Sequence, residues 1–315
     1  MKKKVLIVEK CHDILFDQLN KIGYDCEKKQ KITQTELLEI IDQYYGLVVR
    51  SKIKVDKTLI DQAKRLHFVA RVGSGMELID TAYAKSKKIE CINSPEGNRD
   101  SVAEHVVGCI ISLLKNIHKS NRELKKGDWV REDNRGSELG SKTVGIIGFG
   151  NTGSALSEKL SGFNCKILAY DKYKSNFGDE FVLESKMSDI FAEADIVSIH
   201  LPLNEETNQI INSEFLNNFH KNIYFVNSSR GPIVNTLQFL DLMRAGNIVG
   251  AALDVFEYEP FFEEKSEQER ELLEYYNQYD NLILTPHTAG LTTESYYKLA
   301  EILSQKIKKN KNLSI

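Results

Sequence analysis

Short apolar runs alternate with amphipathic segments along the first ninety residues of the chain. The apolar runs predict strands at 4–9, 45–51, 67–73 and 89–93, and the segments between them predict helices at 12–22, 56–64 and 78–87. Runs of this length, separated by segments of helical period, are typical of βαβ units that build a parallel sheet. The pattern therefore predicts a first α/β domain.

The pattern changes after a turn-rich segment at 93–100. Apolar positions over 101–120 have the spacing of one long helix, and their stripe is wide enough to be buried on more than one side. Ser101 and Glu104 have the spacing of a capping box, so we predict that this helix begins there. A polar arm follows over 121–140 and carries the single tryptophan of the chain, Trp129.

A second series of strands begins at residue 143. We predict a strand and a glycine-rich turn at 143–150, a helix at 152–162, and further strands at 165–171, 195–202, 223–229, 249–256 and 281–287. The acidic stretch 257–280 is predicted to be a solvated loop with a helical piece, and the lysine-rich end after 306 is predicted to fray. The whole chain is thus predicted to form two α/β domains.

Composition narrows the class of protein. The chain has 315 residues, 41% hydrophobic and 28% charged, with a formal net charge of −3. These values are typical of a soluble globular protein and provide no global field for nucleic acid. The apolar run near the start covers only Val5 to Val8, so we expect no signal peptide, and no run is long enough to span a membrane.

The five cysteines are scattered, with no C-x-x-C pair. This spacing predicts a reducing, cytoplasmic location and no metal site.

A glycine-rich motif follows the strand that begins at 143. The motif reads G-x-G-x-x-G over 148–153, it opens a helix, and Asp171 ends the next strand. This arrangement is typical of a dinucleotide-binding unit, in which the pyrophosphate lies at the helix N-terminus. Asp171 can accept hydrogen bonds from both ribose hydroxyls and would repel a 2′-phosphate. We therefore predict NAD in preference to NADP, although Lys172 and Lys174 nearby weaken that preference.

Polar residues follow the other predicted strands of the second domain, at His200-Leu201-Pro202, Ser228-Ser229-Arg230, Asp254 and His287. Ligands of open parallel sheets bind beyond the carboxyl ends of the strands. A guanidinium stays charged, so Arg230 at a strand mouth either points into solvent or meets an anion. Asp254 alone could be a cap and His287 a bonded loop histidine. Together, the residues predict a cleft with one base, carboxylates and a fixed cation.

Five segments, in order, carry a resemblance to a known family: ELGSKTVGIIGFGNTG, VSIHLPLNEETNQIIN, VNSSRGPIVN, GAALDVFEYEP and LTPHTAG. Over most of its length the chain resembles the D-isomer-specific 2-hydroxyacid dehydrogenases. The resemblance implies an α/β fold of two Rossmann/flavodoxin-like parallel-sheet domains with a cleft between them. Residues 1–97 with 290–315 would bind substrate, and 98–289 would bind NAD. It also implies a homodimer formed through the long helix and the arm.

The resemblance implies three groups of site residues. The catalytic residues would be Arg230, Glu259 and His287. The cofactor residues would be Gly148, Gly150, Asn151, Thr152, Gly153, Asp171, His200, Leu201, Pro202, Ser228, Ser229, Arg230, Asp254, His287, Ala289 and Gly290. The substrate residues would be Arg50, Ser51, Arg71, Val72, Gly73, Ser74, Gly75, Arg230 and His287.

The expected chemistry suits these residue types. His287 would take the hydroxyl proton, Glu259 would favour the imidazolium, and Arg230 would bind the carboxylate and polarise the forming carbonyl.

The substrate prediction depends on two arginines at strand ends. The contexts of Arg50 and Arg71 most resemble those of D-3-phosphoglycerate dehydrogenases, in which such arginines hold the phosphate. Arg131 and Arg135 on the arm would add charge from a partner subunit. The alternative for Arg50 and Arg71 is that they are ordinary solvated arginines at strand ends. We expect NAD-dependent oxidation of D-3-phosphoglycerate to 3-phosphohydroxypyruvate, as in serine biosynthesis, or its reverse.

Two alternatives stay open. The first is a glyoxylate or hydroxypyruvate reductase, or another D-2-hydroxyacid dehydrogenase. The second is a corepressor-like protein that senses NADH, because fold alone does not establish catalysis. A chain of 315 residues would lack the C-terminal regulatory extension of many phosphoglycerate dehydrogenases, so we expect no inhibition by serine.

Overall fold

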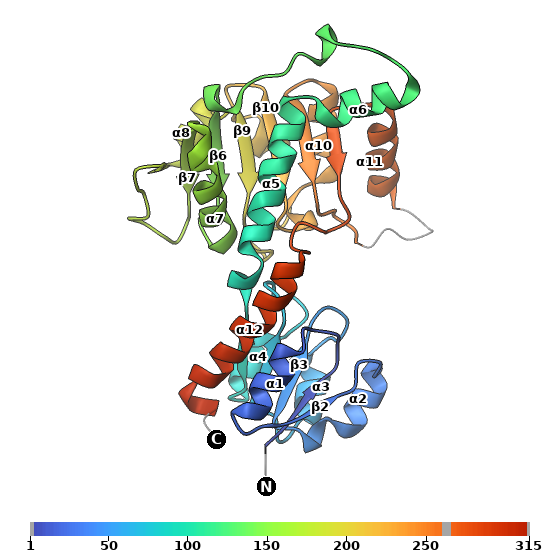
Figure 1. The fold of residues 1–315 in the computed structure, drawn as a ribbon, viewed down its shortest axis with the longest axis vertical. Helices are drawn as coiled ribbons and strands as arrows, with labels where there is room; N and C mark the ends of the chain where they lie inside the picture. Colours follow the sequence, from blue (N-terminus) through green and yellow to red (C-terminus); the bar gives the residue numbers. More distant parts are fainter. Residues whose placement is uncertain (1–2, 260–265, 314–315) are drawn as a thin grey trace. The chain divides into compact units, whose positions relative to one another are not determined.

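The computed structural model describes residues 3–259 and 266–313 (Figure 1). The chain forms two compact units, Met1–Arg99 with Leu291–Ile315, and Asp100–Gly290. Each unit is built on one parallel sheet, of five strands in the first and seven in the second, which confirms the predicted fold class. Residues 260–265 of the predicted acidic loop lie outside the described residues. Within the described ranges, no helix has the length and apolar character needed to cross a bilayer.

The five-stranded unit has the strand order β2-β1-β3-β4-β5. Successive strand residues face opposite sides of the sheet. Val5 and Ile7 of β1 therefore pack with α1 and α12, whereas Leu6 packs with α2, α3 and α4. The C-terminal helix α12 lies beside α1 and completes this core (Figure 1). The elements are β1 (Lys4–Ile7), α1 (Ile14–Lys21), β2 (Asp25–Lys28), α2 (Gln34–Ile40), β3 (Gly46–Val49), α3 (Lys57–Gln62), β4 (Phe68–Arg71), α4 (Thr81–Ser86), β5 (Glu90–Asn93) and α12 (Thr293–Lys309).

The seven-stranded unit has the order β12-β11-β10-β9-β6-β7-β8. Helices α5 and α7 cover one face, and α8, α10 and α11 cover the other (Figure 1). The chain order reverses at β6, which lies between β7 and β9, and ligands of such sheets bind at this switch point. The elements are α5 (Arg99–Leu114), α6 (Ile117–Lys126), β6 (Thr143–Ile147), α7 (Asn151–Leu160), β7 (Lys166–Tyr170), β8 (Val182–Glu184), α8 (Met187–Glu193), β9 (Ile196–Ile199), α9 (Ser213–Leu216), β10 (Ile223–Asn227), α10 (Thr236–Arg244), β11 (Ile248–Leu253), α11 (Glu267–Gln278) and β12 (Leu282–Leu284).

The single helix predicted over 101–120 is two helices. α5 ends at Leu114, and Asn116 has a left-handed φ of 53° immediately before α6. Asparagine tolerates this conformation better than most residues, so the backbone turns where the apolar pattern continues. The predicted capping box is also wrong. Ser101 lies inside α5, and its hydroxyl donates to the carbonyl of Ala289 at 2.6 Å.

The prediction of a fraying C-terminus is wrong for the described residues. α12 continues to Lys309, and Ile307 and Leu313 are both buried. The hydroxyl of Tyr24 donates to the carbonyl of Leu313 at 2.8 Å. The lysines near this end stand between buried apolar positions, so a lysine-rich composition does not prevent the helix from packing on the sheet.

Candidate active site

The turn between β6 and α7 contains three glycines with different structural roles. Gly148 has a φ of 96°, and a Cβ there would lie 2.5 Å from the carbonyl oxygen of His200. A Cβ at Gly153 would lie 2.1 Å from the carbonyl oxygen of Gly148, so the helix packs directly on the turn. At Gly150, a Cβ would meet no heavy atom of the described residues within 4 Å. Space beside Gly150 is therefore open to a ligand, next to the free amide groups that begin α7 at Asn151.

His200, at the end of β9, is within hydrogen-bond distance of Thr152 in the first turn of α7. Its Nδ1 lies 3.1 Å from the hydroxyl of Thr152, and its Nε2 lies 2.8 Å from the hydroxyl of Ser198. Burial lowers the pKa of His200 to about 4, so the imidazole is neutral at physiological pH. The structure thus makes His200 and Thr152, both predicted to bind cofactor, partners of each other.

Asp171 follows β7 and organises the edge of the glycine turn. One carboxylate oxygen, Oδ2, accepts from the amide of Phe149 at 2.8 Å. The other, Oδ1, accepts from the amides of Tyr173 and Lys174 at 2.9 and 3.0 Å. The ammonium of Lys174 donates to the carbonyl of Phe149 at 2.9 Å. Carboxylate oxygens have further lone pairs, so Asp171 can hold this turn and still accept from ribose hydroxyls.

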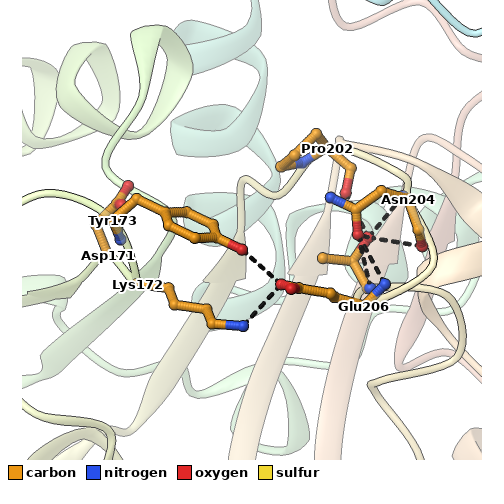
Figure 2. A network of polar contacts seen from close by, with 7 residues as sticks. Asp171, Lys172, Tyr173, Pro202, Asn204 and Glu206 are labelled. Atoms are coloured by element: carbon orange, nitrogen blue, oxygen red, sulfur yellow. Dashed lines mark hydrogen bonds and ion pairs between the residues drawn. The ribbon is translucent and has the colours of Figure 1, made fainter. Parts of the chain in front are cut away.

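The segment after β9 is a tight turn that faces the side chains of Lys172 and Tyr173, the two residues after Asp171 (Figure 2). Leu201 packs against the core, and the carbonyl of Pro202 accepts from the hydroxyl of Thr207 at 2.6 Å. The side-chain oxygen of Asn204 accepts from the amides of Glu206 and Thr207 at 2.9 and 3.0 Å. The backbone of this turn is therefore held by its own side chains.

Arg230 is placed by a buried asparagine at the end of β10. The side-chain oxygen of Asn227 accepts from the amide and hydroxyl of Ser229 at 3.0 and 2.7 Å, and its nitrogen donates to the carbonyl of Arg230 at 3.0 Å. A Cβ at Gly231 would lie 1.6 Å from the carbonyl oxygen of Phe256. Glycine thus allows the loop after β10 to pack against the segment after β11.

Asp254 is buried after β11 and orders the loop that follows β12. Its Oδ1 accepts from the hydroxyl of Thr285 at 2.6 Å and the amide of Thr288 at 2.8 Å, and its Oδ2 accepts from the amide of Ala289 at 2.9 Å. Nε2 of His105 lies 3.2 Å from the Thr285 hydroxyl. Because that hydroxyl donates to Asp254, His105 is the donor to it. Sequence reasoning missed His105 and Thr285, although a polar side chain within the apolar pattern of α5 is a usable signal.

His287 and Glu259 form a hydrogen-bonded pair. Nδ1 of His287 lies 2.7 Å from Oε2 of Glu259, whose Oε1 accepts from the amide of Phe256 at 2.6 Å. The hydrogen bond with Glu259 raises the pKa of His287, burial opposes this, and the charge of Glu259 adds to the rise. The positive charge of Arg230 is close enough to lower that pKa. Arg230, Glu259 and His287 are therefore electrostatic neighbours.

The backbone of His287 has an uncommon conformation. Its φ is 54°, a left-handed value that costs a non-glycine residue on the order of 1 kcal/mol. The amide of His287 donates to the carbonyls of Asp254 and Thr285 at 2.8 and 2.9 Å, which holds this conformation. The pair with Glu259 borders a cavity of about 510 Å³, lined by Phe256, Glu259, Leu273, Tyr276, Leu284, Thr285, Pro286 and His287.

In the five-stranded unit, Glu9 orders the segment that contains Arg50 and Ser51, both predicted to bind substrate. The buried carboxylate accepts from the amides of Arg50 at 2.7 Å, Ser51 at 2.8 Å and Lys52 at 3.1 Å. The guanidinium of Arg50 donates to the carbonyl of Lys10 at 3.4 Å, and its carbon lies 5.8 Å from the ring centre of Tyr296. Glu9 follows β1 and Arg50 follows β3, which are neighbours at the switch point of this sheet.

Arg71, at the end of β4, is bonded within its own unit. Its Nε donates to the carbonyl of Arg50 at 2.9 Å, its Nη1 donates to the carbonyl of Gly75, and Nη1 lies 3.5 Å from a carboxylate oxygen of Glu77. The family resemblance implies that the next four residues, Val72-Gly73-Ser74-Gly75, form a backbone cradle for the substrate carboxylate. Further bonds hold this cradle, from the amide of Val72 to Val49, from the amide of Ser94 to Gly73, and from the hydroxyl of Ser74 to Asn98.

Two observations fit the residues to NAD. The space beside Gly150 would be filled by a Cβ, so glycine keeps it open. The hydroxyl of Ser228 is buried and has no hydrogen-bond partner among the described residues. A buried hydroxyl is costly without a partner, and a polar ligand can supply one.

Three comparisons with known proteins bear on this site. Residues 107–289 match the family described as "D-isomer specific 2-hydroxyacid dehydrogenase, NAD binding domain". A D-3-phosphoglycerate dehydrogenase of Archaeoglobus fulgidus is 32% identical over 96% of this chain and 56% of its own length. A hydroxypyruvate reductase of Thermotoga maritima is 35% identical over 88% of each chain. The crystal structure of an Aquifex aeolicus D-lactate dehydrogenase complexed with NAD and lactic acid matches with a TM-score of 0.82 and 26% identity, over 97% of this chain and 94% of that one. The chain spans about half the length of the phosphoglycerate dehydrogenase that it matches.

Proposed function

Because this chain belongs to the family of D-isomer-specific 2-hydroxyacid dehydrogenases, we propose that it catalyses hydride transfer between NAD and a 2-hydroxy acid. The observation that carries the proposal is the hydrogen bond of 2.7 Å between His287 and Glu259, with the charge of Arg230 nearby. A base, its orienting carboxylate and a fixed cation are the three groups that this reaction needs from the protein.

His287 acts as the acid and base. Its Nδ1 donates to Glu259, so Nε2 is the atom that takes the proton from the substrate hydroxyl, or returns it during reduction. Glu259 favours the imidazolium and sets the orientation of the ring. Arg230 binds the substrate carboxylate and stabilises charge on the oxygen that becomes the carbonyl. When bound, NAD supplies the hydride acceptor.

The cofactor is held by the glycine turn, by Asp171 and by Asp254. The amides at the start of α7 bind the pyrophosphate beside Gly150. Asp171 accepts from the ribose hydroxyls. One donor to Oδ2 of Asp254 is identified, the amide of Ala289, and we propose that this oxygen also accepts from the nicotinamide amide. The backbone segments at 200–202, 228–230 and 287–290 complete the cofactor site.

D-3-Phosphoglycerate is the substrate that we favour. Arg50 supports this choice, because a guanidinium suits phosphate. Glu9 holds the backbone of Arg50 in place by accepting from the amides of Arg50 and Ser51. The guanidinium of Arg71 donates to the carbonyls of Arg50 and Gly75, so we propose that it holds the loop in place and does not bind the phosphate itself. The second candidate is an unphosphorylated acid, since the hydroxypyruvate reductase and a glyoxylate reductase of Thermofilum pendens, at 35% and 32% identity, are as similar as the phosphoglycerate dehydrogenases. A homodimer and a cytoplasmic location stay predictions from the sequence.

A substrate panel tests the proposal. The purified chain is assayed with NAD and NADH against 3-phosphoglycerate, 3-phosphohydroxypyruvate, hydroxypyruvate, glyoxylate and D-lactate. Arg50→Ala should raise KM for the phosphorylated acids by about tenfold or more, the loss of a charged hydrogen bond. It should leave KM for the other acids nearly unchanged. Lys52→Ala removes a positive charge two residues away and is the matched control.

Two outcomes would redirect the proposal. Equal responses of phosphorylated and unphosphorylated acids to Arg50→Ala would favour the second candidate. NADH binding without turnover of any acid would favour a cofactor-sensing protein.

A further inference from the structure

Three side chains meet at the edge of the proposed adenosine site (Figure 2). The ammonium of Lys172 donates to Oε2 of Glu206 at 2.7 Å, and the hydroxyl of Tyr173 donates to the same oxygen at 2.5 Å. Lys172 and Tyr173 follow Asp171 directly, whereas Glu206 comes from the turn after β9. One carboxylate therefore joins the two chain segments that border the ribose-binding residue.

The turn after β9 presents Glu206 in a defined place. The side chain of Asn204 accepts from the amide of Glu206 at 2.9 Å, and buried Thr207 donates to the carbonyl of Pro202 at 2.6 Å (Figure 2). The loop backbone is thus set by bonds that do not involve the carboxylate. A change at Glu206 can alter charge at this edge without removing the bonds that shape the turn.

We propose that Glu206 is a specificity-determining residue for NAD over NADP, acting by holding the ammonium of Lys172. A 2′-phosphate on a ribose bound at Asp171 would bring negative charge close to that carboxylate, and Lys172, the next residue, is a natural phosphate partner. Glu206 takes up the ammonium and adds a second negative charge. The 2′-phosphate of NADP would therefore be repelled by Asp171, and the ammonium of Lys172 that could bind it is already paired with Glu206.

The exposure of the pair supports a role in selectivity. The side chains of Lys172 and Glu206 are 59% and 55% exposed, and exposed ion pairs add little to folding stability. The bond to Glu206 raises the pKa of Lys172, and the bonds from Lys172 and Tyr173 lower the pKa of Glu206. Both groups are charged at neutral pH, so Lys172 is available as a cation once the carboxylate is removed.

Equilibrium binding tests this proposal without any turnover. Titration calorimetry measures the affinities of NADH, NADPH, 5′-AMP and adenosine 2′,5′-bisphosphate for the unchanged protein and for Glu206→Gln. We expect Glu206→Gln to bind NADPH and the bisphosphate about tenfold more tightly, while the affinities for NADH and 5′-AMP change less than about twofold. Glu205→Gln makes the same change of charge one residue away and should leave all four affinities within about twofold.

A double variant separates the ammonium from general charge. In Glu206→Gln with Lys172→Met, the gain for NADPH and the bisphosphate should disappear. The proposal is overturned if Glu206→Gln gives no gain, if Glu205→Gln gives the same gain, or if the gain survives Lys172→Met. It rests on the cofactor placement of the proposed function, which fails separately if the unchanged protein binds neither NADH nor 5′-AMP.

Discussion

The pair of His287 and Glu259 makes a prediction whose sign and size both follow from the structure. Glu259→Gln keeps a side-chain oxygen that can accept from Nδ1 of His287, but it removes the negative charge 2.7 Å from that nitrogen. Glu259 raises the pKa of His287, so its loss lowers that pKa. In the proposed mechanism, reduction of a 2-oxo acid needs protonated His287. The variant should therefore lose reductase activity at a lower pH than the unchanged protein.

The size of the effect depends on solvent exposure. Opposite charges about 4 Å apart attract by about 1 kcal/mol in water and about 4 kcal/mol at the effective dielectric of a protein surface. The side chain of His287 is 52% exposed and that of Glu259 is 27% exposed, so screening favours the lower part of this range. If the imidazolium of His287 loses ~1–2 kcal/mol of stabilisation, the rate should be about tenfold lower at pH values above the pKa of His287 in the variant. Well below it, the two rates should converge.

The assay is the pH profile of kcat and kcat/KM for 2-oxo acid reduction, followed by NADH absorbance. Glu257→Gln is the matched control. It removes the same negative charge two residues away, but the carboxylate of Glu257 accepts from Gln209 and Thr236 and not from His287. If the activity of Glu259→Gln falls at the same pH as that of the unchanged protein, the electrostatic reasoning is refuted. A loss of rate that is equal at all pH values would show that Glu259 acts on geometry alone.

Other consequences of the structure can be measured directly. Glu9→Gln should destabilise the protein by about 1.5–3 kcal/mol at neutral pH, the value of a hydrogen bond to a charged group. Burial by itself would raise the pKa of Glu9, but the hydrogen bonds from the loop amides outweigh it, and the pKa is lowered. The difference between Glu9→Gln and the unchanged protein should therefore vanish as the pH falls through this lowered pKa, and a difference that persists in acid would contradict it. Gly153→Ala places a Cβ 2.1 Å from the carbonyl of Gly148 and should lower Tm, with a cost of about 1–3 kcal/mol. Gly150→Ala should keep Tm within a degree or two and instead weaken NADH binding, since its Cβ enters the ligand space; equal losses of Tm would refute this division. Arg71→Lys should raise KM for phosphorylated and unphosphorylated acids alike, and an increase confined to 3-phosphoglycerate would show direct phosphate binding.

Local patterns predicted most of the sheet strands because buried parallel strands are continuous apolar runs. The prediction missed two edge strands, β2 over 25–28 and β8 at 182–184. β2 has the polar sequence Asp-Cys-Glu-Lys and β8 has only three residues, so neither gives a long apolar run. An edge strand has a single neighbour and needs fewer apolar residues. The break at Asn116 was hidden for the opposite reason, since apolar positions continue on both sides of it.

The sequence by itself determined which residues carry the proposed chemistry: the glycines of the turn, the acid after β7, and the Arg, Glu and His of the second unit. Only the tertiary structure decided how these residues are supported. Asp254 bonds to Thr285, Thr288 and Ala289, which are more than thirty positions away in the chain, and Glu206 reaches Lys172 from another loop. Such contacts depend on the order of strands in the sheet. Hydrophobic periodicity records which side of an element is buried, but it does not record which loops become neighbours.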